Sequence, residues 1–155
     1  MNKIGIVGSG EDKFTTHTRL TARMLIDILI KESIPCVVCS GRSPLGGVDK
    51  WAEEQAEVNY QPTNIFPAKF NNWKQGYRPR NIQIAEFSDI IHVVLVSHYP
   101  DYYEGRRFKS CYHCNSNNHV KSGGCWTAMK ARSFGKPAIR HIIQDDEHTV
   151  EHSSY

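Results

Sequence analysis

Short apolar runs rich in β-branched residues alternate with longer segments of helical periodicity as far as residue 143. The runs predicted as strands are residues 3–10, 36–41, 63–68, 89–98 and 136–143, of which the third is weak. The segments predicted as helices are residues 19–31, 47–56, 78–87 and 123–135. Strands that alternate with helices imply a parallel sheet with helices on both faces. We therefore predict an α/β fold with a doubly wound, mainly parallel sheet of about five strands.

Helical spacing also predicts which side chains pack inward. For the first and last helices these are Leu20, Met24, Leu25, Ile28 and Leu29, and then Trp126, Met129 and Phe134. For the second helix they are Val48, Trp51, Ala52, Gln55 and Ala56. Cys36 and Cys39 are three apart on one predicted strand, so they point to opposite faces and belong to the core. His92, on an apolar strand, is predicted to be a hydrogen-bonded core histidine.

A single domain over residues 1–143 accounts for this pattern. Residues 98–121 form a polar insertion before the last helix that is too long for an ordinary connection. Tyr102, Tyr103 and Tyr112 mingle there with basic side chains, which we interpret as a solvated rim. Residues 144–155 form a polar C-terminal tail, which we expect to be frayed.

Composition narrows the class of protein. No apolar run approaches the roughly 20 residues of a membrane span, and the first residues do not read as a signal peptide. We therefore expect a cytoplasmic protein without a membrane partner. The formal net charge of +3 suits a phosphate-bearing ligand but is too small to demand nucleic acid.

Glycine and serine cluster after three of the predicted strands. The residues are Gly8, Ser9 and Gly10; Ser40, Gly41, Gly46 and Gly47; and Ser122, Gly123 and Gly124. Loops at the carboxyl ends of parallel strands converge on a ligand crevice. Glycine lets backbone N–H groups approach an anion, and the following helix offers further unpaired N–H groups. The three clusters predict a site for a phosphate-bearing ligand.

Three of the five cysteines lie in or beside the insertion. Cys111-x2-Cys114-x4-His119-x5-Cys125 is one residue longer than the spacing of a zinc knuckle. Thiolate and imidazole ligands favour zinc, and a structural zinc ion would order a loop that has little core of its own. His113 and His98 are alternatives to Cys125 as the fourth ligand. The other interpretation is a flexible loop with free thiols.

"SGRSPLGGVDKWAEEQA" (residues 40–56) resembles the SLOG superfamily, a Rossmann-like group. The group includes the DNA-processing protein A fold, the LOG cytokinin-activating enzymes and small YspA-like proteins. Other family motifs follow in the same order: the first glycine turn at residues 8–10, Trp73 with Arg80-Asn81, "FSDIIHVVLV", and "SGGCWTAMKARSFGKPAI". The similarity covers most of residues 1–143 apart from the insertion, and it is closest to the YspA-like branch.

The resemblance implies a site for a nucleotide or nucleotide-derived ligand between the glycine loops. Arg80 would neutralise a phosphate, and Asn81 would hold a ribose or the loop backbone. Asp49 would accept a hydrogen bond from a ribose hydroxyl, or else stabilise the first turn of its helix. Thr127 is retained from the Gly-Gly-x-Gly-Thr motif. Proteins of this family often pair through their helices, so a homo-oligomer is expected.

LOG enzymes hydrolyse the bond between base and ribose phosphate with an acidic residue just after the Gly-Gly motif. Met129 and Lys130 stand there in this chain, and neither can replace a carboxylate. Glu86, Asp101 and Glu104 are possible substitutes, and nothing in the sequence selects one. We predict nucleotide binding first, with single-stranded nucleic-acid binding and phosphoribohydrolase activity as alternatives.

Overall fold

The computed structural model describes residues 1–145 and 149–155, which contain one six-stranded sheet in the order β3-β2-β1-β4-β5-β6. The strands are β1 (Asn2–Gly8), β2 (Cys36–Ser40), β3 (Thr63–Ile65), β4 (Ile90–Val96), β5 (Ala138–Ile143) and β6 (Val150–Ser154). The first five are parallel, and β6 pairs antiparallel with β5. The predicted doubly wound, Rossmann-like α/β architecture is confirmed.

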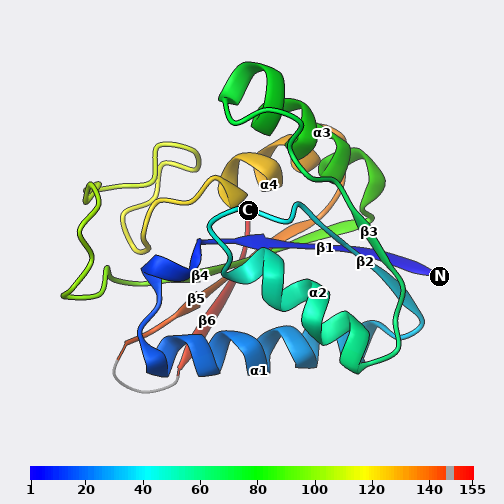
Figure 1. Cartoon of the computed structure of the whole chain (residues 1–155), viewed down its shortest axis with the longest axis horizontal. Helices are drawn as coiled ribbons and strands as arrows, with labels where there is room; N and C mark the ends of the chain where they lie inside the picture. The colour runs from blue at the N-terminus through cyan, green and yellow to red at the C-terminus, as the bar shows by residue number, and fades with distance from the viewer. Residues whose placement is uncertain (146–148) are drawn as a thin grey trace.

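Two layers of helices cover the sheet. The helices α1 (Thr16–Ser33) and α2 (Val48–Val58) pack on one face, and α3 (Arg78–Phe87) and α4 (Gly124–Ser133) pack on the other (Figure 1). The strand order changes direction at β1, because β2 and β3 lie on one side of it and β4 and β5 on the other. The loops after β1 and β4 therefore flank the topological switch point, where ligands bind in open α/β sheets.

Each face of the sheet has its own buried core. Cys36 packs with Ile26 and Ile30 of α1, whereas Cys39 packs with Ile84 of α3 on the opposite face. The prediction that the two thiols belong to opposite faces of the core is therefore confirmed. His92 is also buried as predicted, and its Nδ1 atom lies 2.9 Å from Nε2 of His141 on β5.

Helix α1 is rotated relative to the predicted orientation. It buries Ala22, Leu25, Ile26, Leu29 and Ile30, and it leaves Leu20, Met24 and Ile28 exposed. The prediction was wrong for these last three residues, because apolar side chains occupy more than one stripe of this helix. Periodicity alone does not decide which stripe meets the sheet. In α2, Val48, Trp51, Ala52 and Ala56 are buried as predicted, and Gln55 is half-buried.

Helix α4 packs through small side chains. Cys125, Ala128 and Ala131 are buried, while Met129 and Phe134 are exposed, contrary to prediction; Trp126 is half-buried. A Cβ atom added to Gly124 would lie 3.2 Å from Cα of Gly8 on β1. Because the helix approaches the sheet this closely, its inner face has no room for large side chains.

The predicted frayed tail instead contains β6, whose backbone extends the sheet beyond β5. Its side chains are mostly exposed, so hydrophobic patterning gave no signal for a strand there. His152 contacts His141, and the ring of Tyr155 lies 4.3 Å from the guanidinium carbon of Arg140. Part of the predicted tail, residues 146–148, lies outside the described residues. Across the residues described, no helix is both long and apolar enough to cross a membrane.

Candidate functional site

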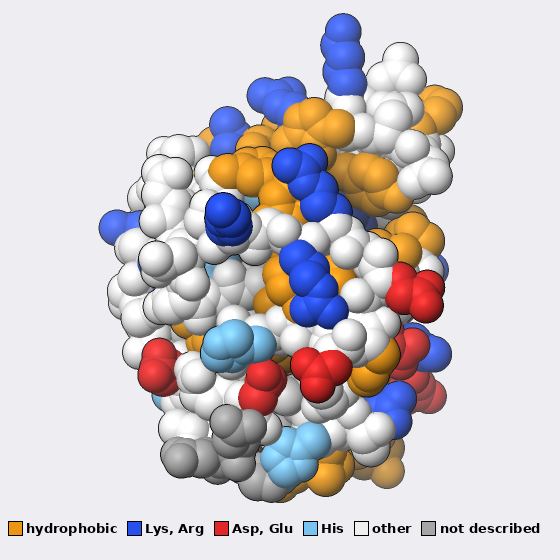
Figure 2. Space-filling model, turned by 90° about the vertical axis from the view of Figure 1, so that its left-hand side faces the viewer, with side chains coloured by type: hydrophobic (Ala, Val, Ile, Leu, Met, Phe, Trp, Pro, Cys, Tyr) orange, Lys and Arg blue, Asp and Glu red, His pale blue; other side chains and the backbone are white. Residues whose placement is uncertain are grey.

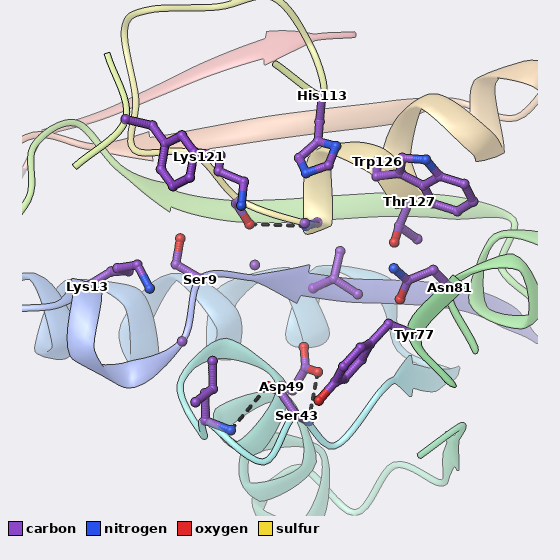
Figure 3. A pocket seen from close by; sticks show the side chains of 18 of the residues that line it. Ser9, Lys13, Ser43, Asp49, Tyr77, Asn81, His113, Lys121, Trp126 and Thr127 are labelled. Carbon is purple, nitrogen blue, oxygen red and sulfur yellow. Dashed lines mark hydrogen bonds between the residues drawn. The ribbon is translucent and has the colours of Figure 1, made fainter. Parts of the chain in front are cut away.

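A pocket of about 770 Å³ opens at the carboxyl edge of the sheet, beside the switch point (Figure 3). Ten of the residues predicted to bind a ligand line it: Gly8, Ser9, Gly10, Asp49, Arg80, Asn81, Ser122, Gly123, Gly124 and Thr127. They come from β1 and the loop after it, α2, α3, and α4 with the loop before it. The sheet topology thus brings together residues that are more than 100 positions apart in the sequence.

Four other predicted residues lie outside this lining. The hydroxyl of Ser40 donates a hydrogen bond to the Ile6 carbonyl at 2.7 Å, so it stabilises the sheet. A Cβ atom on Gly41 would collide with the guanidinium of Arg80. Gly46 and Gly47 have φ values of +68° and +75°, which glycine adopts readily. The fold itself accounts for these glycines and for this serine.

Gly123 differs from its neighbours in the glycine loops. Its backbone is in the ordinary right-handed helical region, with φ −63° and ψ −20°. A Cβ atom built there would have no neighbouring atom within 4 Å. By contrast, a Cβ atom on Gly8 would lie 2.2 Å from the Val94 carbonyl oxygen. The fold therefore requires glycine at position 8 but not at position 123, where the open space faces the pocket.

The hydroxyl of Ser9 is buried and makes no hydrogen bond within the described residues. The residue is only 5% exposed, and its Oγ atom has no hydrogen-bond partner among the described residues. A buried hydroxyl without a partner is costly, and such groups usually have one. The nearby hydroxyl of Ser122 accepts a hydrogen bond from the Gly124 N–H group at 3.1 Å, which caps the start of α4. Ser9 is thus a residue of the pocket lining whose hydroxyl has unused hydrogen-bonding capacity.

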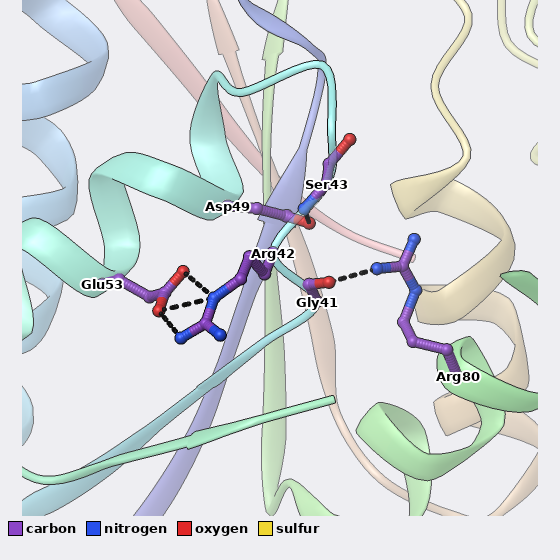
Figure 4. Close-up of polar contacts among 6 residues, drawn as sticks. All are labelled: Gly41, Arg42, Ser43, Asp49, Glu53 and Arg80. Carbon is purple, nitrogen blue, oxygen red and sulfur yellow. Dashed lines mark hydrogen bonds and ion pairs between the residues drawn. The ribbon is translucent and has the colours of Figure 1, made fainter. Parts of the chain in front are cut away.

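Arg80 and Asp49 are both buried at the pocket wall, where much of their hydrogen bonding serves the fold (Figure 4). Arg80 donates from Nη1 to the Gly41 carbonyl and from Nε to Oδ1 of Asn81 at 2.8 Å. The Asp49 carboxylate accepts a hydrogen bond from the Ser43 N–H group at 3.0 Å. Burial raises the pKa of Asp49, and the positive charge of Arg80 partly opposes this rise. Burial also disfavours the charged form of Arg80, and this lowers its pKa.

Asp49 is the single carboxylate residue in the pocket lining within the described part of the chain. Glu86, Asp101 and Glu104, the possible substitutes for the missing LOG acid, do not line the pocket and are exposed. If hydrolysis took place here, Asp49 would be the carboxyl group available as an acid or base.

The insertion forms one wall of the pocket, which the sequence did not predict. Tyr99, Tyr103, Arg106, Phe108, Tyr112, His113 and Lys121 all line it. Figure 2 views the molecule from the side of the insertion. In the upper part of that view, Lys and Arg side chains lie among hydrophobic ones, and most visible Asp and Glu side chains lie below them. The rim interpretation was therefore incomplete for Tyr103 and Tyr112. The mixture of aromatic and basic residues was the available signal, but it does not reveal where a loop folds.

Two side chains of the insertion hold its shape. The hydroxyl of Tyr102 donates a hydrogen bond to the Phe14 carbonyl at 2.6 Å. Arg107 donates through Nη2 to the carbonyl groups of Pro100, Asp101 and Tyr103 at 3.0–3.2 Å. Sequence reasoning also missed Lys13 and Tyr77, which line the pocket from the 3₁₀ turn η1 (Glu11–Lys13) and the π-helical turn η2 (Trp73–Tyr77).

A second cluster lies where the insertion meets α4. One potential metal-binding atom from each of Cys111, Cys114, His119 and Cys125 lies within 4.8 Å of the others, and this set could hold a metal ion. Nε2 of His119 is 3.2 Å from Sγ of Cys114 and 3.9 Å from Sγ of Cys125. Ligand atoms around a tetrahedral zinc ion lie about 3.5–3.8 Å apart, given bonds of roughly 2.0–2.3 Å. The predicted four residues are thus gathered close to these separations, and small shifts of their side chains would give a tetrahedral set.

Neither alternative ligand belongs to this cluster. His113 lines the pocket, and His98 is an exposed residue 3.6 Å from the Asp145 carboxylate. Contacts around the four residues suit metal binding. Nδ1 of His119 lies 2.8 Å from the Val120 carbonyl, so an N–H group there leaves the Nε2 lone pair free for a metal. The Tyr155 hydroxyl lies 3.0 Å from Sγ of Cys125.

Two of the thiols are shifted toward the thiolate that a metal requires. A hydrogen bond from Cys125 is the main cause that lowers the pKa of Cys111 to about 6 and that of Cys114 to about 4. The same hydrogen bonds raise the pKa of Cys125. A bound cation would favour the thiolate form of all three cysteines.

Comparisons with known proteins add no further assignment. No protein-family model, curated protein or solved structure matches this chain. The similarity to the SLOG superfamily therefore remains a prediction from the motifs.

Proposed function

We propose that this protein binds a nucleotide or nucleotide-derived ligand in the pocket at the carboxyl edge of the sheet. The observation that carries the proposal is the buried Ser9 hydroxyl, which has no hydrogen-bond partner in the described residues and faces the pocket. A phosphate oxygen would accept its hydrogen bond. The open space over Gly123 leaves room for that phosphate at the start of α4, where the helix dipole favours an anion.

The remaining lining suits the other parts of a nucleotide. Trp73 and Trp126 form an edge-to-face pair, with ring centroids 5.0 Å apart, and Tyr77 lies on the same side of the pocket. These three aromatic rings would stack on a base. Asn81 and Thr127 offer hydrogen-bonding groups beside them. Arg80 would add positive charge to the site, although part of its donor set already serves the fold.

The Cys111, Cys114, His119 and Cys125 cluster supports a structural role for zinc. Three thiolates and one imidazole in a closed, mostly buried set are typical of structural zinc sites. Cys125 lies in the first turn of α4, directly after Gly123 and Gly124. A metal ion held there would tie the insertion to the glycine loop, so one segment would serve both as metal site and as pocket wall.

The test is thermal unfolding of the metal-replete protein with a panel of nucleotides. A ligand that binds only the folded state should add about 2.7 kcal/mol at 100 times its dissociation constant. Ser9→Ala should leave the stability of the free protein unchanged or slightly higher, because it removes an unsatisfied buried hydroxyl. The same variant should weaken binding of the active nucleotide about tenfold, the effect of losing one hydrogen bond to a charged group.

Ser88 supplies a matched control. Its hydroxyl is also buried without a hydrogen-bond partner in the described residues, but it lies outside the pocket lining. Ser88→Ala should therefore leave nucleotide affinity unchanged. If no nucleotide raises the unfolding temperature, or if Ser9→Ala and Ser88→Ala behave alike, the proposal fails.

Single-stranded nucleic acid is the second candidate ligand. The aromatic and basic side chains of the insertion favour it, since such side chains stack on bases and contact phosphates. Strand binding should show a steep dependence of affinity on salt concentration, because many phosphate contacts release counterions. A shallow dependence would support a single nucleotide in the pocket.

A further inference from the structure

The pocket has two aromatic ends, and Ser9 lies on the side of Lys13 and Lys121. Trp126 and Tyr77 lie at one end, together with Asn81, whereas Lys13 and Lys121 lie at the other (Figure 3). We call the first the helix end, because α3, α4 and η2 form it, and the second the insertion end. The insertion end also contains the rings of Tyr103, Phe108 and Tyr112. A mononucleotide has one base and would leave one of these ends unused.

The insertion end carries cations without partners. Nζ of Lys121 lies 4.6 Å from the ring centroid of Phe108 and 5.1 Å from that of Tyr112. The guanidinium carbon of Arg106 lies 4.5 Å from the Phe108 centroid. Within residues 1–145 and 149–155, neither cation forms an ion pair with a carboxylate. Two uncompensated positive charges over aromatic rings favour an anion that is attached to a flat group.

We propose that the ligand is a dinucleotide: two nucleosides joined through phosphate, with one base at each aromatic end. Ser9 and the loop at Gly123 would contact the linking phosphate, while Lys121 and Arg106 would neutralise its charge from the insertion end. The volume of about 770 Å³ is in the upper part of the roughly 300–1,000 Å³ that is typical of small-molecule sites. This inference rests on the proposed nucleotide-binding function and narrows its ligand class.

A dinucleotide fits the charges better than a longer strand does. The cations in the pocket lining are Lys13, Arg80, Arg106 and Lys121, and they surround one pocket. Lys13 already pairs with Asp12 at 3.0 Å, and Arg80 is engaged with Gly41 and Asn81. A strand would need positive charge that continues along its backbone.

The first experiment is isothermal titration calorimetry of the metal-replete protein with ligands of graded size. The probes are nucleoside monophosphates, nucleoside triphosphates, dinucleotides joined by a phosphodiester or a pyrophosphate, and a longer single strand. Dinucleotides should bind at least about tenfold more tightly than their component mononucleotides, a difference of about 1.4 kcal/mol. If a triphosphate binds as tightly as the dinucleotides, or the longer strand binds more tightly, the inference is overturned.

Variants of the insertion end locate the second half of the ligand. Lys121→Ala and Arg106→Ala should each weaken dinucleotide binding about tenfold, as expected for a lost contact to a charged group. Mononucleotide affinity should change less than about twofold, because the helix end is intact. Tyr112→Leu, which keeps bulk but removes the stacking face, should show the same selectivity for dinucleotide binding.

Lys109→Ala is the matched control, since Lys109 is an exposed basic residue of the insertion that does not line the pocket. It should leave both affinities unchanged, and thermal unfolding should verify that every variant folds. An equal loss in Lys109→Ala and Lys121→Ala would overturn the inference in favour of general charge attraction. If mononucleotides bind as tightly as dinucleotides, only this inference fails. If no nucleotide binds at all, the proposed function fails with it.

Discussion

The hydroxyl of Tyr155 lies 3.0 Å from the Sγ atom of Cys125, so the residue that follows β6 contacts the candidate metal site. Cys125 belongs to the first turn of α4, beside the glycine loop of the pocket. The aromatic ring of the same tyrosine packs on Arg140 of β5. Tyr155 therefore connects three parts of the molecule, namely the antiparallel edge of the sheet, the candidate metal cluster and the pocket wall.

Tyr155→Phe should weaken metal binding without unfolding the protein. A hydroxyl that donates to a thiolate ligand stabilises its negative charge, and loss of such outer contacts typically lowers metal affinity about 10–100-fold. Competition with a chromophoric chelator would measure the change. Tyr102→Phe is the control, because its hydroxyl bonds to the Phe14 carbonyl, away from the metal cluster. Equal metal affinity in Tyr155→Phe and the unsubstituted protein would contradict this prediction.

Removal of the metal should lower both stability and nucleotide affinity. The insertion has no helix or strand among its residues, and its regular pairing is one isolated bridge between Cys111 and Ser116. A metal ion would therefore supply much of the order of this wall. We expect chelation, or Cys114→Ser, to lower the unfolding temperature and to weaken nucleotide binding at least tenfold.

Metal analysis by mass spectrometry would identify the ion, with zinc expected at one per chain. Cys39→Ser offers a useful contrast, because Cys39 lies in the core below α3, outside the cluster. It should lower stability while leaving metal content unchanged. A chelated protein that keeps full nucleotide affinity would show that the metal does not shape the pocket.

How far the sequence predicts this molecule depends on which interactions form each part. The five parallel strands and four helices follow from local patterns of apolar residues, and the cysteine spacing was sufficient to predict which residues form the candidate metal cluster. The orientation of α1 was mispredicted because Leu20, Met24 and Ile28 make a second apolar stripe. β6 was missed because backbone pairing and single contacts such as His141–His152 hold it, rather than an apolar face.

The pocket wall illustrates a different limit. Ser9 and Gly123 lie in glycine-rich loops whose position after strands is visible in the sequence. Tyr103 and Lys121 reach the same pocket through an insertion whose path depends on long-range contacts, including Tyr102 to Phe14. Residue types alone indicate that such a loop could contact a nucleotide, but its place in the fold comes from tertiary structure.

Stability should fall as the pH drops from about 6.5 toward 4, because of the histidines in the sheet. Burial lowers the pKa of His92 to about 4 and is the main cause that lowers the pKa of His141 to about 3, both from the ordinary histidine value of 6.5. Between pH 6.5 and the lowered pKa of each histidine, the unfolded chain binds protons that the folded chain does not, so acid favours unfolding. The contribution of these neutral histidines to the free energy of unfolding is fully present above pH 6.5. For His92 it is on the order of 3 kcal/mol relative to acid conditions.

Urea unfolding between pH 4 and pH 8 would measure this dependence. His92→Asn should reduce the slope of the unfolding free energy against pH below pH 6.5. Its effect should extend to the histidines that it contacts in sequence, because His92 lies against His141 and His141 lies against His152. A slope in His92→Asn equal to that of the unsubstituted protein would contradict the assignment.

Two glycines of the pocket should respond in opposite ways to substitution by alanine. At Gly8 the new Cβ atom would meet the Val94 carbonyl oxygen at 2.2 Å and a methyl group of Val48 at 2.9 Å. Overpacking of this kind costs about 1–3 kcal/mol. At Gly123 the conformation is helical and nothing lies within 4 Å. Gly123→Ala should therefore be neutral, or stabilise the fold by about 0.4–1 kcal/mol through a less flexible unfolded chain.

Nucleotide binding separates the structural glycine from the one that we assign to ligand approach. Gly123→Ala should weaken binding even though the fold keeps its stability, and Gly123→Val should weaken it further, because each added methyl group occupies the phosphate position. Urea unfolding and calorimetry on the same samples would give both quantities. Full nucleotide affinity in a stable Gly123→Val protein would mean that the phosphate does not approach the start of α4, and the ligand would then have to bind elsewhere in the pocket.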